Sequence, residues 1–137
     1  MKRLILAAGL FAATLTASLH AQTMNMLASI PFDFQIGSTV LPAGEYSIRH
    51  SSGVLFVKET GGAHKSGVFT TVGEDRPVGS KPAGTLLFNR YGDTYFLSKV
   101  WNGESKQAVA TPKTPREKEL ARHIGQTGTT TVALQTY

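Results

Sequence analysis

Short runs of alternating apolar and polar residues, each ended by glycine or proline, constrain this chain more than any other feature of its sequence. The clearest two are Thr85–Tyr91 and Thr94–Trp101, which are rich in β-branched and aromatic residues and are joined by Gly92 and Asp93. A period of two residues is typical of a β-strand, and glycine accepts the positive φ that a two-residue turn requires. The sequence therefore predicts an antiparallel hairpin over residues 85–101.

The register of this hairpin follows from its turn. A two-residue turn places Phe88 opposite Leu97 and Arg90 opposite Tyr95. Because both faces of the hairpin are partly apolar, we expect the pair either to be covered on two sides or to belong to a strongly curved sheet. The apolar sets are Leu86, Phe88, Leu97 and Trp101 on one face, and Leu87, Phe96 and Val100 on the other.

The same alternation predicts strands along the rest of the chain. Pro31 cannot donate a ladder hydrogen bond, so the strand 30–36 is expected at an edge or to begin its pairing after this residue. Tyr46 and Ile48 face one way in the next strand, and the segment 73–84 is the longest expected loop. The predicted strands are 30–36, 45–50, 54–58, 68–72, 85–91, 94–101, 107–110 and 129–137.

The period changes near the C-terminus. Thr114, Pro115 and Glu117 have the spacing of a capping box, in which the threonine hydroxyl accepts from the first turn and the carboxylate reaches back to the cap. We expect a helix that runs to about His123 and ends at Gly125. It carries one large apolar residue before its last turn, so it is expected to lie on the surface.

Together these elements predict an all-β fold. The expected form is a small antiparallel meander, β-barrel or β-sandwich of about seven or eight strands, with one short helix near the C-terminus. Mostly local connections favour a meander over a Greek key. The length of 137 residues suits one domain.

The N-terminus has the pattern of a secretory signal. Two basic residues precede the apolar run 4–13, and Ala21 offers a peptidase site, with cleavage after Ser18 as the second choice. The apolar run is interrupted well short of the roughly 20 residues that a membrane span needs. We therefore expect residues 1–21 to be a cleaved signal peptide and 22–137 to be a single β domain, periplasmic or extracellular, without a membrane span.

The amino-acid composition argues against some classes of partner and of metal site. Lys2 and Arg3 leave with the leader, so 12 of the 14 basic residues remain against 9 acidic ones. An excess this small gives no reason to expect nucleic acid as a partner. The sequence has no cysteine, which excludes disulfide-stapled miniproteins and Cys-ligated zinc or iron–sulfur sites.

Several segments, taken in order, resemble a known group of proteins. They are Ile30–Phe34 with Leu41–Tyr46, then Phe88–Ser98, then Arg116–Ala121. On these segments the chain is similar to the short secreted, uncharacterised proteins that are numerous in acidobacterial genomes. The resemblance implies an exported bacterial protein, and it brings no catalytic residues with it.

Few residues carry chemistry in a recognisable arrangement. After the leader the histidines are His50, His64 and His123, and none lies in a nucleophile motif or in metal-ligand spacing. We interpret them as surface or helix-capping residues, with a meeting of His50 and His64 across a hairpin as the alternative. The sequence also has no phosphate loop or dinucleotide fingerprint. It therefore predicts no catalytic residue, no cofactor and no metal.

The candidate ligand or partner surface is an aromatic and basic set along the predicted hairpin. It consists of Arg90, Tyr91, Tyr95 and Trp101. Such side chains stack on a sugar ring or a base, or anchor a protein partner. The alternative is that Tyr95 and Trp101 pack in or beside the core, with Arg90 over Tyr95 as a cross-strand cation–π pair.

The expected function is that of an exported, non-enzymatic β domain with a binding or scaffolding role at the cell envelope. Its expected partner is an envelope protein or a polysaccharide. One alternative is a carrier of a small apolar ligand in a barrel interior, and a hydrolase is another. A small outer-membrane barrel is prompted by the terminal Tyr137, but Gln135, Ala133 and Thr131 occupy the positions in step with it, where apolar residues would be needed.

Overall fold

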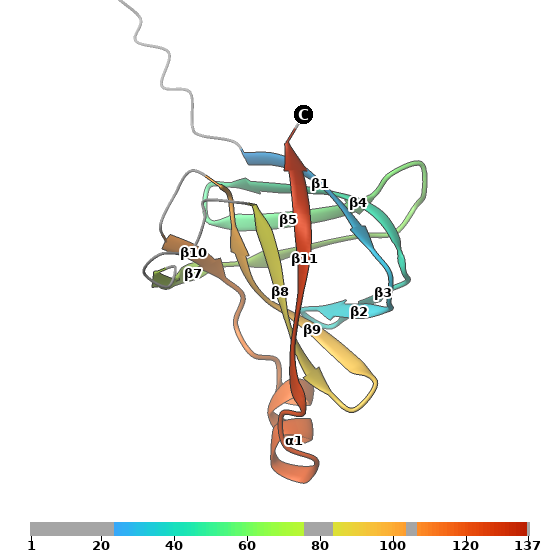
Figure 1. Cartoon of the computed structure of the whole chain (residues 1–137), viewed down its shortest axis with the longest axis vertical. Helices are drawn as coiled ribbons and strands as arrows, with labels where there is room; N and C mark the ends of the chain where they lie inside the picture. Colours follow the sequence, from blue (N-terminus) through green and yellow to red (C-terminus); the bar gives the residue numbers. More distant parts are fainter. Residues whose placement is uncertain (1–23, 76–83, 104–106, 137) are drawn as a thin grey trace, which may run out of the picture.

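The computed structural model describes residues 24–75, 84–103 and 107–136, and the predicted signal peptide lies outside them. Within these ranges the chain is mostly strand, with one helix, α1, at Pro115–His123 (Figure 1). The prediction of an all-β fold with one short helix near the C-terminus is confirmed. The strands are β1 Met24–Ile30, β2 Phe34–Ile36, β3 Thr39–Leu41, β4 Gly44–Ser51, β5 Val54–Glu59, β6 Lys65–Phe69, β7 Thr71–Asp75, β8 Thr85–Tyr91, β9 Thr94–Trp101, β10 Gln107–Ala110 and β11 Gly128–Thr136.

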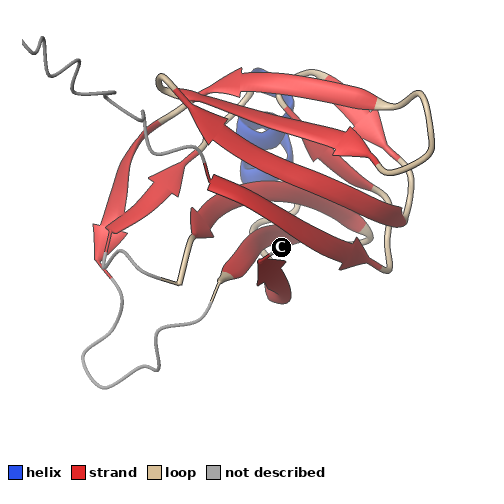
Figure 2. Ribbon diagram, turned by 90° about the horizontal axis from the view of Figure 1, so that it is seen from above, coloured by secondary structure: helices blue, strands red, loops and turns tan. Residues whose placement is uncertain are grey.

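The strands form one curved sheet that nearly closes into a barrel (Figure 2). Its main order is β3-β2-β9-β8-β11-β1-β4-β5-β6, and β10 pairs with both β9 and β7. β6 and β7 follow each other along the chain, so the pairing of β6 with β5 leads into the pairing of β7 with β10. A sheet that returns to itself leaves few unpaired edges, which stabilises a small β domain.

The strand order departs from a simple meander at two places. β11 lies between β1 and β8 and pairs antiparallel with both. β2 meets β9 in a parallel pairing of Gln35 with Phe96. The local connections expected from the turn signals hold for β4 to β6 and for the β8–β9 hairpin. Closure of the barrel, by contrast, depends on a strand that is distant in sequence.

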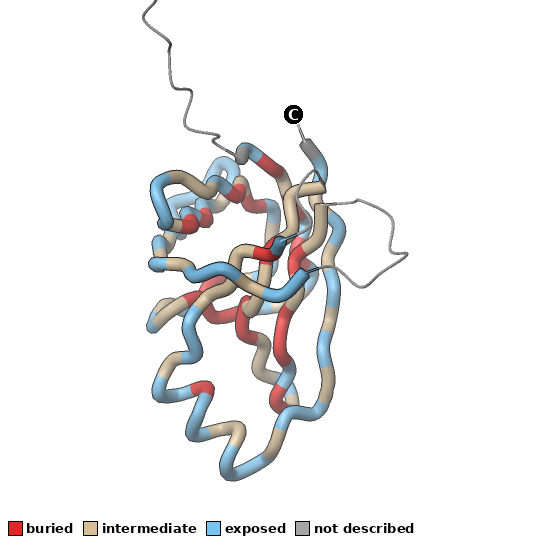
Figure 3. The backbone as a smooth tube through the Cα atoms, turned by 90° about the vertical axis from the view of Figure 1, so that its left-hand side faces the viewer, coloured by how far each residue is buried: buried red, intermediate tan, exposed pale blue. Residues whose placement is uncertain are grey.

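The core lies inside the barrel (Figure 3). Alternation turns one set of apolar side chains inward along each strand, and Tyr46 and Ile48, which were predicted to share a face, are both buried. Phe34 makes edge-to-face contacts with Tyr46 and Phe88, at ring-centroid distances of 5.1 and 5.5 Å. Burying an apolar side chain of this size contributes about 1.5–3 kcal/mol. The inward residues are Met26, Ala28, Ile30, Phe34, Ile36, Leu41, Tyr46, Ile48, Leu55, Val57, Leu86, Phe88, Leu97 and Val100.

The β8–β9 hairpin has the predicted register next to its turn. Phe88 pairs with Leu97 and Arg90 with Tyr95. Both expected arrangements of the hairpin are present, because the sheet curves into a barrel and α1 covers part of its other face at Tyr91. The prediction from turn chemistry is therefore confirmed over this half of the hairpin.

A bulge changes the inward set at the far end of the hairpin. The register shifts so that Leu86 pairs with Val100, and Val100 is buried in the core. The expectation that Trp101 shares a face with Leu86, and that Val100 lies opposite, is therefore wrong. Thr111 binds the bulge, since its N–H and its hydroxyl donate to Ser98 O at 2.9 and 3.2 Å. One extra residue in β9 shifts the alternation by one position, so the residues after it lie on the opposite face from the one predicted. The sequence pattern alone does not reveal such a bulge.

The predicted strand 30–36 is divided in two. β1 ends at Ile30, and β2 follows after a break of three residues. Pro31 has no N–H to continue the ladder, and the Asp33 carboxylate accepts from the backbone N–H of Ala43 at 2.9 Å. β2 then pairs with β3 instead of β4. The prediction of a single strand is wrong, although its apolar residues face the core as expected.

The predicted strand 68–72 is also divided, at Thr70. The backbone N–H and the hydroxyl of Thr70 donate to Gly53 O at 2.9 and 3.0 Å. The chain leaves the ladder with β5 there and enters β7, which runs to Asp75. The expected loop therefore starts later than predicted, and 76–83 lie outside the described residues. These two divisions and the short β3 explain why the described residues form eleven strands where about seven or eight were predicted.

The helix α1 begins and ends where the sequence predicts. Thr114 is its N-cap, with Oγ1 accepting from the N–H of Glu117 at 3.2 Å, and Pro115 follows. Gly125, just beyond the helix, has a φ of 78°. The capping-box prediction is wrong in one respect, because the Glu117 carboxylate points to β8 instead of back to the cap. Glu117 is the buried residue of this otherwise surface helix.

Candidate functional site

Arg90 and Tyr95, two of the four residues predicted as a binding surface, contact each other across the hairpin. The Arg90 Cζ lies 5.7 Å from the centroid of the Tyr95 ring. Tyr95 is also stacked on Phe32, with ring centroids 4.0 Å apart. Arg90 Nε donates to Gly92 O at 2.7 Å. The cation–π pair that the sequence offered as the alternative is therefore present, and it covers one rim of the core.

Tyr91 and Trp101 lie apart from this pair. Tyr91 is 1% exposed and sits on the other face of β8, beneath α1. Trp101 lies at the opposite end of the hairpin from the turn, where it pairs with Thr85. Its indole Nε1 is buried without a hydrogen-bond partner in the part of the chain that the structure describes. The four residues therefore do not gather on one face.

Glu117 is the centre of a buried polar cluster between α1 and β8. Its Oε2 accepts from Tyr91 Oη at 2.9 Å and from Asn89 Nδ2 at 3.1 Å. Gln126 Nε2 adds a longer contact to Asn89 Oδ1, at 3.4 Å. Burial, together with the hydrogen bond to Glu117, raises the pKa of Tyr91 to about 12. The cluster fastens the helix to the barrel, and every polar atom named here has a structural partner.

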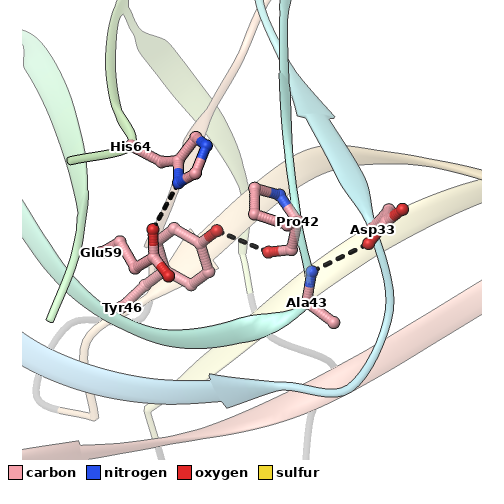
Figure 4. A network of polar contacts seen from close by, with 6 residues as sticks. All are labelled: Asp33, Pro42, Ala43, Tyr46, Glu59 and His64. Carbon is pink, nitrogen blue, oxygen red and sulfur yellow. Dashed lines mark hydrogen bonds and ion pairs between the residues drawn. The ribbon is translucent and has the colours of Figure 1, made fainter. Parts of the chain in front are cut away.

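A second polar cluster holds one end of the barrel (Figure 4). Tyr46 Oη donates to Pro42 O at 2.5 Å, so the buried ring of β4 anchors the turn before it. Nearby, His64 Nδ1 and Glu59 Oε2 are 2.5 Å apart. Burial raises the pKa of Tyr46, and the charges of Glu59 and Asp33 add to the effect. These groups fix the β3–β4 and β5–β6 connections.

The histidines considered in the sequence are separated in the fold. His50 Nε2 lies 2.9 Å from Thr70 Oγ1, and burial lowers the pKa of its imidazole. His64 contacts Glu59 at the other end of β5. Over the described ranges, no group of three or more His, Asp or Glu side chains is placed to hold a metal ion. The helix α1 is too short to cross a membrane, and the described residues contain no helix that could.

A groove of about 770 Å³ crosses the outside of the barrel over β1, β4, β5 and β6. The ladder arranges its central side chains in two rows. In the first row Phe56 lies between Arg49 and Gly67, and in the second Lys58 lies opposite Lys65. Their neighbours along β4 and β5 point into the core, so these side chains point outward. We call these five residues the outer groove.

Phe56 is held by its two cross-strand neighbours. Arg49 Cζ lies 5.0 Å from its ring centroid, within the range of a cation–π contact. A Cβ placed on Gly67 would lie 3.3 Å from Phe56 Cδ1, so the absence of a side chain there makes room for the ring. Phe56 remains 39% exposed. The row thus presents a fixed guanidinium beside an apolar wall.

The outer groove carries three positive charges and no carboxylate. In the described residues the ion pairs are His64–Glu59 and Lys99–Glu74, and neither involves Arg49, Lys58 or Lys65. Charges that face water over a concave surface attract anions and concentrate them locally. The arrangement is therefore able to bind an anionic ligand.

The sequence motifs did not indicate this groove, although alternation carries a signal for it. Arg49 lies on the face of β4 opposite to Tyr46 and Ile48, and Phe56 and Lys58 alternate with the core residues of β5. Their alignment depends on the register of β4 with β5 and of β5 with β6. Comparison of the chain with protein-family models, with curated proteins and with solved structures gave no match.

Proposed function

We propose that this chain is an exported, non-enzymatic β domain that binds a partner at the cell envelope through the outer groove. The observation that carries the proposal is the gathering, on one concave outer face, of an exposed aromatic ring and three cations that form no ion pair with any described residue. A charged, partly apolar concavity of this kind is typical of a ligand or partner site. The N-terminal pattern of basic residues and a short apolar run supports export.

The packing of the barrel interior favours an external site over carriage of an apolar ligand. Phe34, Tyr46 and Phe88 are each at most 1% exposed, and the ring of Phe34 contacts the other two rings inside the barrel. A ligand of any size would have to displace close-packed side chains. The inward direction of the apolar residues also differs from a membrane-spanning barrel, whose apolar side chains point outward.

The side chains that a hydrolase would use are engaged in structural contacts, which also favours binding over catalysis. His50 contacts Thr70, His64 contacts Glu59, and Glu117 accepts from two buried donors. A catalytic triad needs a nucleophile, a base and an orienting acid within hydrogen-bond reach of one another. Turnover in a broad hydrolase panel that disappears with His50→Ala or His64→Ala would support the enzyme alternative instead.

Cell fractionation tests the proposal. Cells that express the full chain are separated into cytoplasm, periplasm, envelope and medium, and the N-terminus of the protein in each fraction is sequenced. We expect a chain that starts at Gln22 or Leu19, sediments with the envelope and is released by high salt, because screening weakens exposed charge contacts. A cytoplasmic chain that keeps Met1 would refute export. A processed chain that stays in the soluble fraction at low salt would refute envelope binding.

A further inference from the structure

Lys58 and Lys65 stand directly opposite each other on neighbouring antiparallel strands, and both are exposed. Like charges in this position destabilise a strand pair. Arg49 adds a third cation in the adjoining row. Glu45, the acid on the same face of β4, lies next to the lysine row on the side away from Arg49, and it forms no ion pair with either lysine. An anion bound between the cations would relieve this repulsion. Without a bound anion, the repulsion only lowers the stability of the fold.

The spacing of the three cations suits a chain of negative charges. Neighbouring strands lie about 4.8 Å apart, and residues on one face of a strand recur about every 6.6 Å. Lys65, Lys58 and Arg49 therefore present positive charge at intervals of this order along the groove. A polymer with one negative charge per repeating unit is able to contact all three cations at once. A single small anion contacts only one or two of them.

The walls of the groove supply the other contacts that a sugar chain needs. Asn25 and Ser47 line it with an amide and a hydroxyl, which donate to and accept from sugar hydroxyls. Phe56 supplies an apolar wall for the ring face of a sugar. On the same face, one row beyond Phe56, lies Phe69, which is 80% exposed. An aromatic ring left in water to this extent is typical of a binding surface.

We propose that the outer groove binds an acidic polysaccharide, a sugar chain with carboxylate groups along its length. This inference rests on the proposed envelope-binding function and names its ligand class. In this arrangement Lys58, Lys65 and Arg49 form ion pairs with the carboxylates. Phe56 packs against the sugar rings, and the polar side chains of the walls form hydrogen bonds with their hydroxyls. A bilayer surface is flatter than the groove, and an acidic peptide such as polyglutamate has no ring face to lie against Phe56. The observations therefore favour the polysaccharide over both.

The test is a binding titration of protein purified from expression of the full chain. The probes are polygalacturonate, neutral dextran, polyglutamate, and vesicles of phosphatidylglycerol with phosphatidylcholine. We expect binding to polygalacturonate that weakens steeply as salt increases, because bound cations release the counterions of a polyanion. Dextran, polyglutamate and the vesicles are expected to bind much more weakly. Equal binding of dextran, or stronger binding of polyglutamate or vesicles, would overturn the proposal.

Matched variants locate the site. Lys58→Gln combined with Lys65→Gln is expected to weaken polygalacturonate binding about tenfold or more, and to reduce the slope of log affinity against log salt by roughly one to two. Lys113→Gln combined with Lys118→Gln removes the same charge from exposed positions near and on α1, and is expected to change affinity by about twofold at most. Equal losses in both double variants would show a non-specific charge effect and refute the site.

A second variant keeps the test independent of folding. Lys58→Glu places an acid opposite Lys65, which turns a repulsive cross-strand pair into an attractive one. We expect this variant to unfold at a slightly higher temperature and yet to lose polygalacturonate binding. Undiminished binding by this folded variant would refute the proposal. The result is separate from the fractionation experiment, which can fail on export even if the purified protein binds the polymer.

Discussion

The hydroxyl and the ring of Tyr91 both make contacts that stabilise the fold. The sequence placed it in a candidate binding surface, but its hydroxyl donates to Glu117 and its ring packs edge-to-face on Phe96, at a centroid distance of 5.7 Å. The hydrogen bond ties β8 to α1. Tyr91 follows Arg90 directly in the chain and therefore points to the other face of β8, because successive side chains of a strand face opposite ways.

The raised pKa of Tyr91 predicts a loss of stability at alkaline pH. The folded state holds the phenol proton up to a pKa of about 12, whereas the ordinary value is 10.0. This contribution is therefore fully present below pH 10 and is lost as pH rises through about 12. We expect Tyr91→Phe to lower stability by about 1–2 kcal/mol at neutral pH and to make the alkaline decline shallower.

Urea unfolding followed by Trp101 fluorescence, at a series of pH values, measures this difference. Burial also raises the pKa of Tyr46, so part of the decline is expected to remain in the variant. Tyr95→Phe is the matched control, since the Tyr95 ring is stacked on Phe32 and is not part of the Glu117 cluster. A Tyr91→Phe protein with the same alkaline decline as the parent would contradict the argument.

At the scale of elements, α1 depends on one buried carboxylate more than on apolar packing. The helix buries Glu117 alone, and both donors to its Oε2 come from β8. Glu117→Leu would leave a buried amide and a buried hydroxyl without their acceptor, so we expect a loss of about 3 kcal/mol. Glu117→Gln keeps an acceptor oxygen and is expected to lose about 1 kcal/mol.

Hydrogen exchange over 115–123, together with urea unfolding, distinguishes the two variants. The Leu variant is expected to lose amide protection in α1 before the barrel opens, since local opening needs less free energy than global unfolding. Glu119→Gln, an exposed change on the same helix, is expected to stay within about 0.5 kcal/mol of the parent. Equal stability of the Glu117→Leu and Glu117→Gln variants would show that the polar cluster around Glu117 does not hold α1 on the barrel.

The strands that were predicted with the wrong limits share a physical cause. Pro31, Thr70 and the bulge at Ser98 each interrupt a ladder, and each interruption is tied to a distant segment. Asp33 binds Ala43, Thr70 binds the turn at Gly53, and Thr111 binds the bulge. Alternation shows which residues are apolar, but it does not show where a strand changes partners.

At the scale of the whole molecule, β11 joins the two halves of the sheet, β3-β2-β9-β8 and β1-β4-β5-β6. It pairs with β1 over Ala28↔Leu134 and its neighbours, and with β8 from Gly128 to Ala133. Truncation after Thr127 would leave both strands with long unpaired edges. We expect a chain without a cooperative unfolding transition, measured by Trp101 fluorescence. Thr131→Val, which keeps the ladder, should unfold within about 0.5 kcal/mol of the parent. Cooperative unfolding of the truncated chain would show that the barrel closes without β11.

The sequence by itself determined the class of the fold, the position of the helix and its caps, and the shared face of Tyr46 and Ile48. Each of these follows from local chemistry: periodicity, turn residues and capping residues within a few positions of one another. It also indicated that Phe88 meets Leu97 and that Arg90 covers Tyr95, because a two-residue turn fixes the pairing next to it.

Only the tertiary structure decided which segments meet across the barrel. The capping glutamate turned out to bind Asn89 and Tyr91, and three cations from β4, β5 and β6 came to lie over one groove. Both outcomes depend on strand register, which is set by closure of the sheet and by bulges far from the residues concerned. A sequence pattern that repeats every two residues indicates the face of the sheet on which a side chain lies. It does not indicate which residue lies opposite that side chain on the neighbouring strand.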